Sequence, residues 1–390
     1  MKTSVLFMIH NMNVGGTEKS LLSLLTNIDK EKYEVTILML EKHGGYLNSI
    51  PNWVKKEYVK GYNNMKPIVM NPPLQTIKTF IKQGELIKGF KTLFSYINAK
   101  STSMWLPFYK QALKNYPVKS YDIAIAYAGP SDFITYFIAE KINAPKKLQW
   151  IHFDVLKIKL NTNFGKIYYP KFDIINCVSE NSKKEMQQVF PKIKNNIKVF
   201  NNIVNTREIK ELSKKVNSFK YNYPGIKIVT LGRLSNEKGQ QMIPKVVEKL
   251  KNDGYLFKWY CIGEGILLNE LKREIKEKKI MDELILLGVK INPYPFLKDC
   301  DIYVQTSLHE GYGLTLHEAK LFNKPIITTN FQTAKEQIIH NKTGLIVDIT
   351  SEGLYNGIKN IIDNPDKQKM FSENLLIENN KLSSNKKTVL

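Results

Sequence analysis

Cysteine is scarce in this sequence. Only three of the 390 residues are cysteines, Cys177, Cys261 and Cys300, and each lies within or beside an apolar run. They are far apart, and none has a partner at the short spacing typical of paired metal ligands. This argues against a zinc site and against a secreted fold held by disulfides. We therefore expect three buried thiols in a reducing compartment.

Long apolar runs are also missing. No stretch approaches the roughly 20 consecutive apolar residues that a membrane-spanning helix needs. The first apolar run, residues 5–9, is interrupted by His10 and Asn11, and no small-residue cleavage site follows. It predicts a β-strand and not a signal peptide. The expected location is the cytoplasm, either free or peripherally attached to the inner face of the plasma membrane.

Acidic residues are few relative to basic ones. The chain has 58 lysines and arginines against 36 aspartates and glutamates, a formal net charge of +22. This favours an anionic partner, and either nucleic acid or a membrane surface would serve. Within residues 51–120, twelve lysines interleaved with aromatics stand against Glu57 and Glu85, which leaves +10. The pattern indicates amphipathic helices with basic edges, or equally a solvated lysine face over core aromatics.

The order of apolar and periodic segments indicates two domains. Residues 5–9, 17–25 and 35–40 give a strand, a helix and a strand, and a second series of this kind begins at residues 226–231. A chain of this length naturally divides into two domains. The predicted class is α/β, with two doubly wound Rossmann-like lobes. We expect these lobes at residues 1–204 and 205–390, with a basic helical insertion near 51–120.

One stretch in the second predicted lobe combines the features of a ligand site. An apolar strand at 301–306 leads to a turn at Gly313, and a helix follows at 314–322. The first N–H groups of a helix lack intrahelical partners and suit phosphate oxygens. Glu310 precedes the turn and Glu318 lies inside the helix, so one carboxylate can approach a sugar and the other a ribose. A structural turn beside a solvated helix face is the simpler alternative.

Two cations follow the first strand of that lobe. Arg233 and Lys238 lie in the loop 232–239, at the carboxyl end of the strand 226–231. Ligands bind at the carboxyl ends of strands in open α/β sheets, so both side chains can face one diphosphate. The alternative is two surface cations in an ordinary loop.

Together these residues resemble a known family. The spacing Glu310-x7-Glu318 around Gly-Tyr-Gly, and Gly-Arg-Leu-x-x-x-Lys-Gly at 232–239, are similar to the motifs of glycosyltransferase family 4, whose members are retaining nucleotide-sugar transferases. The resemblance implies the GT-B fold, in which two lobes face each other across a central cleft. It also implies that the second lobe holds most of the donor and that the first lobe is the acceptor side.

The resemblance assigns roles to individual residues. Glu318 would bind the ribose hydroxyls and Glu310 the sugar hydroxyls. Arg233 and Lys238 would offset the charge that builds on the leaving nucleoside diphosphate. The phosphates and the sugar would be contacted by Tyr312, Gly313, Leu314 and Thr315, the last standing where the family more often has proline.

Further positions match the family in order and context. Gly15 and Gly16 lie in a strand-to-helix loop that would face the donor's diphosphate or the acceptor, although such a loop is often plain punctuation. His152 follows the strand 147–151 and would lie against the donor sugar as a catalytic group, or be a satisfied structural histidine. Gly263 and Glu264 belong to a loop that would lie near the nucleotide.

No metal and no cofactor are expected. Asp299 and Asp301 match the Asp-x-Asp metal motif of another glycosyltransferase fold, but they precede a buried strand, at the wrong sheet edge for a site at the carboxyl ends. Asp301 more simply caps the start of that strand.

The resulting hypothesis is retaining transfer of a hexose or N-acetylhexosamine from a nucleotide sugar, with UDP favoured. The acceptor would be a lipid-linked glycan or a polysaccharide, in capsule, exopolysaccharide or lipopolysaccharide synthesis, beside an anionic membrane surface. One alternative is a basic nucleic-acid-binding protein, although the motif glycines are spread through both lobes. A phosphorylase or an epimerase on the same fold is another.

Overall fold

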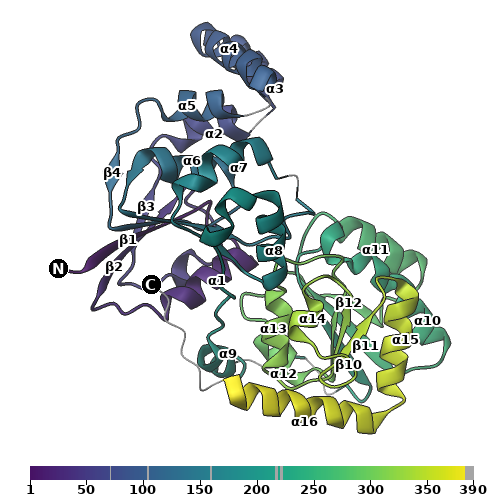
Figure 1. Cartoon of the computed structure of the whole chain (residues 1–390). Helices are drawn as coiled ribbons and strands as arrows, with labels where there is room; N and C mark the ends of the chain where they lie inside the picture. The colour runs from purple at the N-terminus through teal and green to yellow at the C-terminus, as the bar shows by residue number, and fades with distance from the viewer. Residues whose placement is uncertain (71, 103–104, 159, 216–217, 220–222, 383–390) are drawn as a thin grey trace. The chain divides into compact units, whose positions relative to one another are not determined.

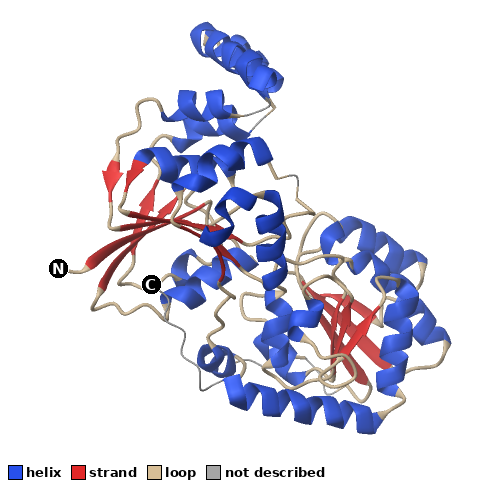
Figure 2. Cartoon of the chain, in the orientation of Figure 1, coloured by secondary structure: helices blue, strands red, loops and turns tan. Residues whose placement is uncertain are grey.

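The chain forms two compact units. The computed structural model describes residues 1–70, 72–102, 105–158, 160–215, 218–219 and 223–382. The N-terminal unit is Met1–Asn201 and the C-terminal unit is Asn202–Leu390. Each unit has its own parallel sheet with helices around it (Figures 1 and 2). Residues 383–390 lie outside the described residues.

The N-terminal unit is built on a seven-stranded parallel sheet in the order β3-β2-β1-β5-β7-β8-β9. Its central strand β1 is buried on both faces, as is usual for a parallel sheet covered by helices. The strands are β1 (Thr3–Ile9), β2 (Tyr33–Met39), β3 (Lys55–Tyr58), β5 (Ile123–Ala126), β7 (Lys146–Ile151), β8 (Ile174–Cys177) and β9 (Ile197–Val199), while β4 (Lys119–Ser120) and β6 (Ile142–Asn143) pair separately.

Helices of two kinds accompany this sheet. Those that connect its strands are α1 (Gly16–Leu25), α6 (Asp132–Lys141), α7 (Thr162–Tyr168) and α8 (Glu180–Val189), with the short 3-10 turns η1 (Leu47–Ser49), η2 (Tyr169–Lys171) and η3 (Pro191–Asn196). Between β3 and β4 the chain forms α2 (Tyr62–Met70), α3 (Pro73–Lys82), α4 (Leu86–Thr102) and α5 (Leu106–Leu113). In Figure 1, α3 and α4 lie side by side as a hairpin.

The C-terminal unit has a six-stranded parallel sheet in the order β12-β11-β10-β13-β14-β15. Its strands are β10 (Ile226–Leu231), β11 (Phe257–Ile262), β12 (Leu284–Leu286), β13 (Ile302–Gln305), β14 (Ile326–Thr329) and β15 (Leu345–Val347). The helices are α9 (Thr206–Leu212), α10 (Ile243–Asn252), α11 (Leu268–Glu277), α12 (Tyr294–Asp299), α13 (Leu314–Lys320), α14 (Ala334–Gln337), α15 (Ser351–Ile362) and α16 (Pro365–Leu382), with the 3-10 turns η4 (Asn236–Lys238) and η5 (Gln240–Met242).

Two apolar clusters cover the two faces of this sheet. Successive side chains of a strand point to opposite faces, so Ile302 and Val304 of β13 join one cluster while Tyr303 joins the other. The predicted α/β class with two doubly wound lobes is confirmed. The three cysteines are buried and free, as expected. Among the described residues, no helix is long and apolar enough to cross a bilayer.

Both sheets reverse their direction of winding at one point. In the N-terminal unit the chain runs from β1 outward to β3 and then returns to β5, on the other side of β1. In the C-terminal unit it runs from β10 to β12 and returns to β13, beside β10. Ligands of doubly wound folds bind outside the carboxyl ends of the strands at such a switch point. The loops after β1 and β5, and those after β10 and β13, are therefore the candidate positions.

Candidate functional site

The two motif loops of the C-terminal unit meet at its switch point. The loop after β10 carries Lys238, and the loop after β13 carries Glu310. The N–H of Leu308 donates to the carbonyl of Glu237 at 2.9 Å, and the hydroxyl of Thr306 donates to the carbonyl of Lys238 at 2.7 Å. The ammonium of Lys238 then lies 2.6 Å from Oε2 of Glu310. Residues 72 positions apart in the sequence thus form one ion pair.

Glu310 is held from three sides. Its Oε1 accepts hydrogen bonds from Nε2 of Gln305 at 2.8 Å and from the hydroxyl of Ser307 at 2.7 Å, while Oε2 faces Lys238. The carboxylate is largely buried. A buried carboxylate with three donors has little rotational freedom, and its position is fixed before any ligand arrives.

Gln305 is the centre of the surrounding hydrogen-bond network. Its Oε1 accepts from the hydroxyl of the buried Tyr303 and, at 3.2 Å, from that of Thr315. Its Nε2 donates hydrogen bonds to the hydroxyl oxygen of Ser307 and to Oε1 of Glu310. Gln305 and Ser307 were not among the predicted site residues. A signal was present, because polar residues at the carboxyl end of an otherwise apolar strand lie where ligands bind in such sheets.

The turn before α13 depends on a glycine and a distant glutamine. Gly313 has φ 80° and ψ 53°, a left-handed conformation that other residues seldom adopt, and it caps the first turn of the helix. Nε2 of Gln337 donates to the carbonyl of Tyr312 and, at 3.3 Å, to that of Gly313. The structure thus places Tyr312, Gly313 and Leu314 at the switch point. The helix ends at Lys320, two residues before the predicted end.

Glu318 lies deeper than a surface ligand-binding residue would. Only 1% of its surface is exposed, and the hydroxyl of Tyr294 donates to its Oε1 at 3.5 Å. The carboxyl groups of Glu310 and Glu318 both lie close enough to the buried Tyr303 to raise the pKa of its phenol, after the larger effect of burial itself. Both glutamates therefore lie near Tyr303 of β13.

Arg233 and Lys238 differ in their freedom. The side chain of Arg233 is 68% exposed, and its Nη1 is 4.0 Å from Oε1 of Glu237. An exposed pair at this distance contributes little, so the guanidinium can turn toward an arriving anion. Its backbone is fixed, because Nε2 of Gln240 donates to the carbonyl of Arg233 at 2.9 Å.

The loop after β11 packs against the loop after β10. A Cβ atom at Gly263 would stand 2.0 Å from the carbonyl oxygen of Gly232, and its φ is +144°. The N–H of Leu234 donates to the carbonyl of Glu264 at 2.9 Å. The side chain of Glu264 is exposed. Gly263 therefore has a packing role, which is sufficient to explain a glycine there.

Gly15 and Gly16 lie at the switch point of the N-terminal unit. Gly15 caps α1, after β1. A Cβ at Gly16 would meet nothing within 4 Å, and one at Gly15 would meet only the side chain of Glu18. Packing within the unit gives no reason for this glycine pair.

His152, one strand away, is buried. The backbone N–H of His152 donates to the carbonyl of Gly129 at 3.0 Å, and the imidazole ring contacts the ring of Tyr127 edge-on. Burial lowers the pKa of the imidazole to about 4, against the smaller opposite effect of a hydrogen bond with the backbone of Tyr127. Nε2 has no hydrogen-bond partner among the described residues. A neutral imidazole with an unpaired ring nitrogen can accept a hydrogen bond from a hydroxyl group.

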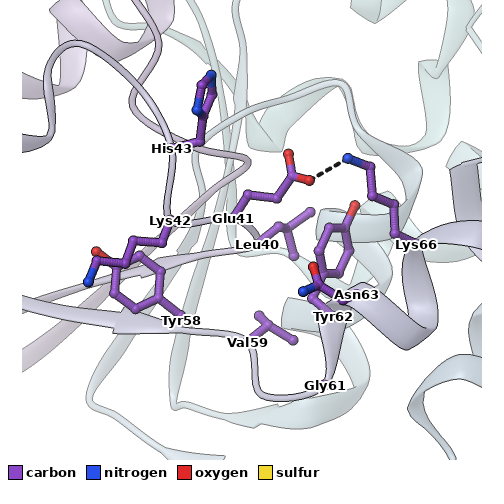
Figure 3. A pocket seen from close by; sticks show the side chains of 10 residues that line it. All are labelled: Leu40, Glu41, Lys42, His43, Tyr58, Val59, Gly61, Tyr62, Asn63 and Lys66. Atoms are coloured by element: carbon purple, nitrogen blue, oxygen red, sulfur yellow. Dashed lines mark hydrogen bonds and ion pairs between the residues drawn. The ribbon is translucent and has the colours of Figure 1, made fainter.

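A cavity of about 630 Å³ opens at the carboxyl ends of β2 and β3 (Figure 3). Its lining includes Glu41 and Lys66, which form an ion pair, and the neighbouring His43 and Tyr58. None of the predicted site residues lines it. It is connected to the loop after β1 through the backbone, because the N–H of Met12 donates to the carbonyl of His43 at 2.9 Å.

The Asp-x-Asp motif lies at the amino end of the C-terminal sheet, away from that unit's switch point. Oδ2 of Asp301 accepts from the N–H of Lys227 at 2.8 Å, at the amino end of β10, and Oδ2 of Asp299 accepts from the hydroxyl of Ser218 at 2.7 Å. Asp301 thus holds the start of β13, as the sequence analysis suggested. Within the part of the chain that the structure describes, no group of three His, Cys, Asp or Glu side chains could hold a metal ion.

Comparisons with known proteins agree with this geometry. Residues 203–375 match the family model described as "Glycosyl transferases group 1". Over 207 residues the chain is 25% identical to the N-acetylgalactosamine-N,N'-diacetylbacillosaminyl-diphospho-undecaprenol 4-alpha-N-acetylgalactosaminyltransferase of Campylobacter jejuni, covering 53% of this chain and 55% of that one. Over 184 residues it is 30% identical to an uncharacterized glycosyltransferase, MJ1059, of Methanocaldococcus jannaschii, covering 45% and 44%.

The chain thus spans about half the length of these curated relatives in its matches. Among solved structures, Anabaena HepE in complex with UDP-glucose is similar over 98% of both chains, with a TM-score of 0.66 and 15% identity. The fold defined by the two units is GT-B. Within the C-terminal unit, residues 203–375 match the group 1 glycosyltransferases, the family that the motifs resembled. Both the predicted family and the predicted fold are confirmed.

Proposed function

We propose that this protein is a retaining glycosyltransferase that moves a hexose or N-acetylhexosamine from a UDP-sugar to a lipid-linked or polysaccharide acceptor. The observation that carries the proposal is the Lys238–Glu310 pair, which closes the switch point of the C-terminal unit at 2.6 Å. Both residues lie within the part of the chain that matches the family. The presence of UDP-glucose in the HepE structure favours a uridine donor.

The donor occupies the loops after β10 and β13. Glu318 accepts from the ribose hydroxyls and Glu310 from the sugar hydroxyls, since charge-assisted hydrogen bonds are the stronger ones. The backbone at Tyr312, Gly313 and Leu314 contacts the phosphates and the sugar. The hydroxyl of Thr315 holds this turn by its hydrogen bond to Oε1 of Gln305. Glu264 and its loop border the nucleotide.

The reaction exchanges one bond at the anomeric carbon for another. The bond between C1 and the diphosphate oxygen breaks, and its electron pair leaves with the diphosphate. The acceptor hydroxyl oxygen bonds to C1 on the same face, and its proton passes to the leaving phosphate oxygen. Arg233 and Lys238 stabilise the charge that develops on the diphosphate. No side chain is then needed as a general base.

The N-terminal unit contributes the acceptor side. Neutral His152 accepts a hydrogen bond from a hydroxyl of the donor sugar through Nε2, which is unpaired within the described residues. The open space around Gly15 and Gly16 lets substrate approach the backbone. The Campylobacter relative is named for a diphospho-undecaprenol substrate, which supports a lipid-linked acceptor. The protein then works at the cytoplasmic face of the plasma membrane, in capsule, exopolysaccharide or lipopolysaccharide synthesis.

Titration calorimetry tests the donor class. We expect UDP to bind in the micromolar range, and UMP, GDP and a single-stranded oligonucleotide to bind at least tenfold more weakly, because the diphosphate and the base are both recognised. Tight oligonucleotide binding without UDP binding would instead support the nucleic-acid alternative.

Product analysis tests the reaction. Incubation with UDP-sugars and an undecaprenyl-linked glycan should release UDP and give an axial linkage by proton NMR. Conversion of the UDP-sugar to another UDP-sugar without acceptor would identify an epimerase. Phosphate-dependent cleavage of a glycan would identify a phosphorylase.

A further inference from the structure

Helix α4 buries small and polar side chains and part of Tyr96, and it exposes most of its large apolar side chains. The buried positions are Gly89, Thr92 and Ser95. The exposed large apolar residues, hereafter the apolar α4 face, are Leu86, Ile87, Phe90, Leu93, Phe94 and Ile97. Ile87, Phe90 and Phe94 keep 72%, 71% and 68% of their surface exposed. A surface helix of a globular protein normally has the opposite arrangement.

Specific contacts fix this orientation. A Cβ at Gly89 would stand 3.3 Å from Cγ1 of Ile81, so the glycine lets α4 pack closely on α3. The hydroxyl of Ser95 donates to Oε1 of Gln111 in α5 at 2.8 Å. The apolar α4 face is therefore a property of the folded unit.

The exposed residues form one continuous stripe. They recur at intervals of three or four positions, which places them on the same side of a helix. No charged residue lies within the stripe, because Lys91 borders it and Lys88 lies on the opposite side of the helix. Single exposed apolar residues are normal on protein surfaces, but a contiguous set of this size marks an interaction surface.

The charge of the hairpin indicates the partner. Residues 73–102 contain five lysines and one glutamate, a formal net charge of +4. Lys88 pairs with Glu85 at 2.6 Å, while Lys78, Lys82 and Lys91 are exposed. Apolar side chains flanked by lysines suit the boundary between the headgroups and acyl chains of an anionic bilayer. A second copy of the hairpin would bring the same positive charge and be repelled.

We propose that the α3–α4 hairpin docks the protein on an anionic membrane, with the apolar α4 face entering the acyl boundary and the lysines contacting lipid phosphates. The inference rests on the proposed function, which places the acceptor on a lipid. It adds a defined surface and a mode of attachment. Lysines alone would release the protein at high salt, whereas an inserted apolar face keeps part of the binding.

Vesicle sedimentation measures this attachment. The wild-type protein should bind phosphatidylcholine vesicles that contain phosphatidylglycerol, and part of this binding should survive 0.5 M salt. The variant Phe90→Ser with Phe94→Ser should bind roughly tenfold more weakly at both salt concentrations. The variant Lys82→Gln with Lys91→Gln should bind more weakly than the wild type at low salt and equally at 0.5 M salt. Met281→Ser with Ile291→Ser, which removes two similarly exposed apolar residues of the C-terminal unit, should bind as the wild type does.

Fluorescence reports insertion directly. In Phe90→Trp, the new indole should shift to the blue on anionic vesicles and be quenched by lipids brominated along their chains. No binding by the wild type, or binding without quenching, would overturn the proposal. Sedimentation equilibrium tests the alternative that a second copy of the chain covers the apolar α4 face. If the wild type were a dimer and Phe90→Ser with Phe94→Ser a monomer, the face would be assigned to that second copy.

UDP calorimetry separates this proposal from the function on which it rests. All hairpin variants should bind UDP as the wild type does, because the hairpin belongs to the N-terminal unit and the loops proposed to hold the donor belong to the C-terminal unit. UDP binding without vesicle binding would reject the docking surface alone. Vesicle binding without UDP binding would reject the donor assignment and leave the surface in place.

Discussion

The two units share an architecture and differ in what they place at its switch point. In the C-terminal unit, the loops after β10 and β13 are joined by charged and polar side chains, among them Lys238, Glu310 and Gln305. In the N-terminal unit, the corresponding positions hold the glycine pair and, one strand away, the buried neutral His152. The fold fixes where a ligand can bind, and the side chains decide whether charge or shape recognises it.

This difference agrees with where the family signal lies. The match covers residues 203–375, within the C-terminal unit. A diphosphate needs particular cations and a particular turn, so its site is recognisable in the sequence. A site made of glycines and one imidazole leaves a weaker pattern, and the surrounding helices are free to vary.

The largest expected effect comes from opening the pair at the C-terminal switch point. Lys238→Ala should lower turnover by roughly 10²–10³-fold, because it removes a cation that acts on the leaving diphosphate. Lys249→Ala is the matched control. Lys249 also pairs with a glutamate, Glu352, at 2.9 Å, but both partners are exposed, and such pairs contribute little.

The double variant shows whether Lys238 and Glu310 act as one unit. Glu310→Gln alone should cost about as much as Lys238→Ala, and the two together little more than either. The assignment of the pair to the donor site would be contradicted if the fold losses in turnover of the two single variants multiplied in the double variant. An equal loss of turnover in Lys249→Ala would contradict it as well.

The second effect concerns nucleotide affinity. Glu318→Gln should weaken UDP binding in calorimetry by at least tenfold, since hydrogen bonds to a charged group contribute about 1.5–3 kcal/mol each. Glu318 is buried, so urea unfolding must show that the variant is folded. Glu373→Gln, an exposed change on α16, serves as the control. Wild-type UDP affinity in Glu318→Gln would remove Glu318 from the donor site.

Much of the C-terminal site could be predicted from the sequence. The strand-turn-helix order placed Glu310 before the turn and Glu318 in the helix, and the motif after β10 gave Arg233 and Lys238. Their meeting follows from the strand order, which puts β13 beside β10. Gln337 could not be predicted, because it lies 24 positions after the turn carbonyl that it holds and belongs to no motif.

The N-terminal unit was harder to predict for a physical reason. Residues 51–120 showed lysines among aromatics, and the apolar spacing of α4 is that of a helix with one buried face. The sequence does not reveal that Thr92 and Ser95 take the buried side, since that depends on the packing of Gly89 against Ile81 of α3 and on the hydrogen bond from Ser95 to Gln111 of α5. The edge strand β3 was also missed, because its sequence Lys-Lys-Glu-Tyr is polar.

A smaller effect tests the neutral imidazole of the N-terminal unit. The pKa of His152 is lowered to about 4 from 6.5, so the unfolded chain binds more protons between these values. Stability is therefore complete above pH 6.5 and falls as pH drops toward 4, by roughly 1–2 kcal/mol at pH 5. Urea unfolding of the wild type at pH 8 and pH 5 should show this loss.

The variant His152→Gln isolates that contribution. It cannot titrate, so its loss of stability between pH 8 and pH 5 should be smaller than that of the wild type. Burial raises the pKa of nearby Asp132 to about 6, which has the opposite dependence, but this affects both proteins alike. Equal losses in the two proteins would mean that His152 is protonated in the folded state at pH 5.

The smallest expected effect is that of a chelator on turnover. Lys238 and the exposed Arg233 supply positive charge at the C-terminal switch point, where a divalent cation would otherwise neutralise the diphosphate of the proposed donor. Asp299 and Asp301, the residues with the spacing of a metal motif, lie at the amino end of the sheet and accept hydrogen bonds from Ser218 and Lys227. We therefore expect turnover in excess EDTA to stay within about twofold of the untreated rate. A reversible loss of turnover that manganese restores in the wild type but not in Asp301→Asn would return the metal role to the Asp-x-Asp motif. If manganese instead restored activity to Lys238→Ala alone, the lysine would be shown to occupy the electrostatic place of a cation.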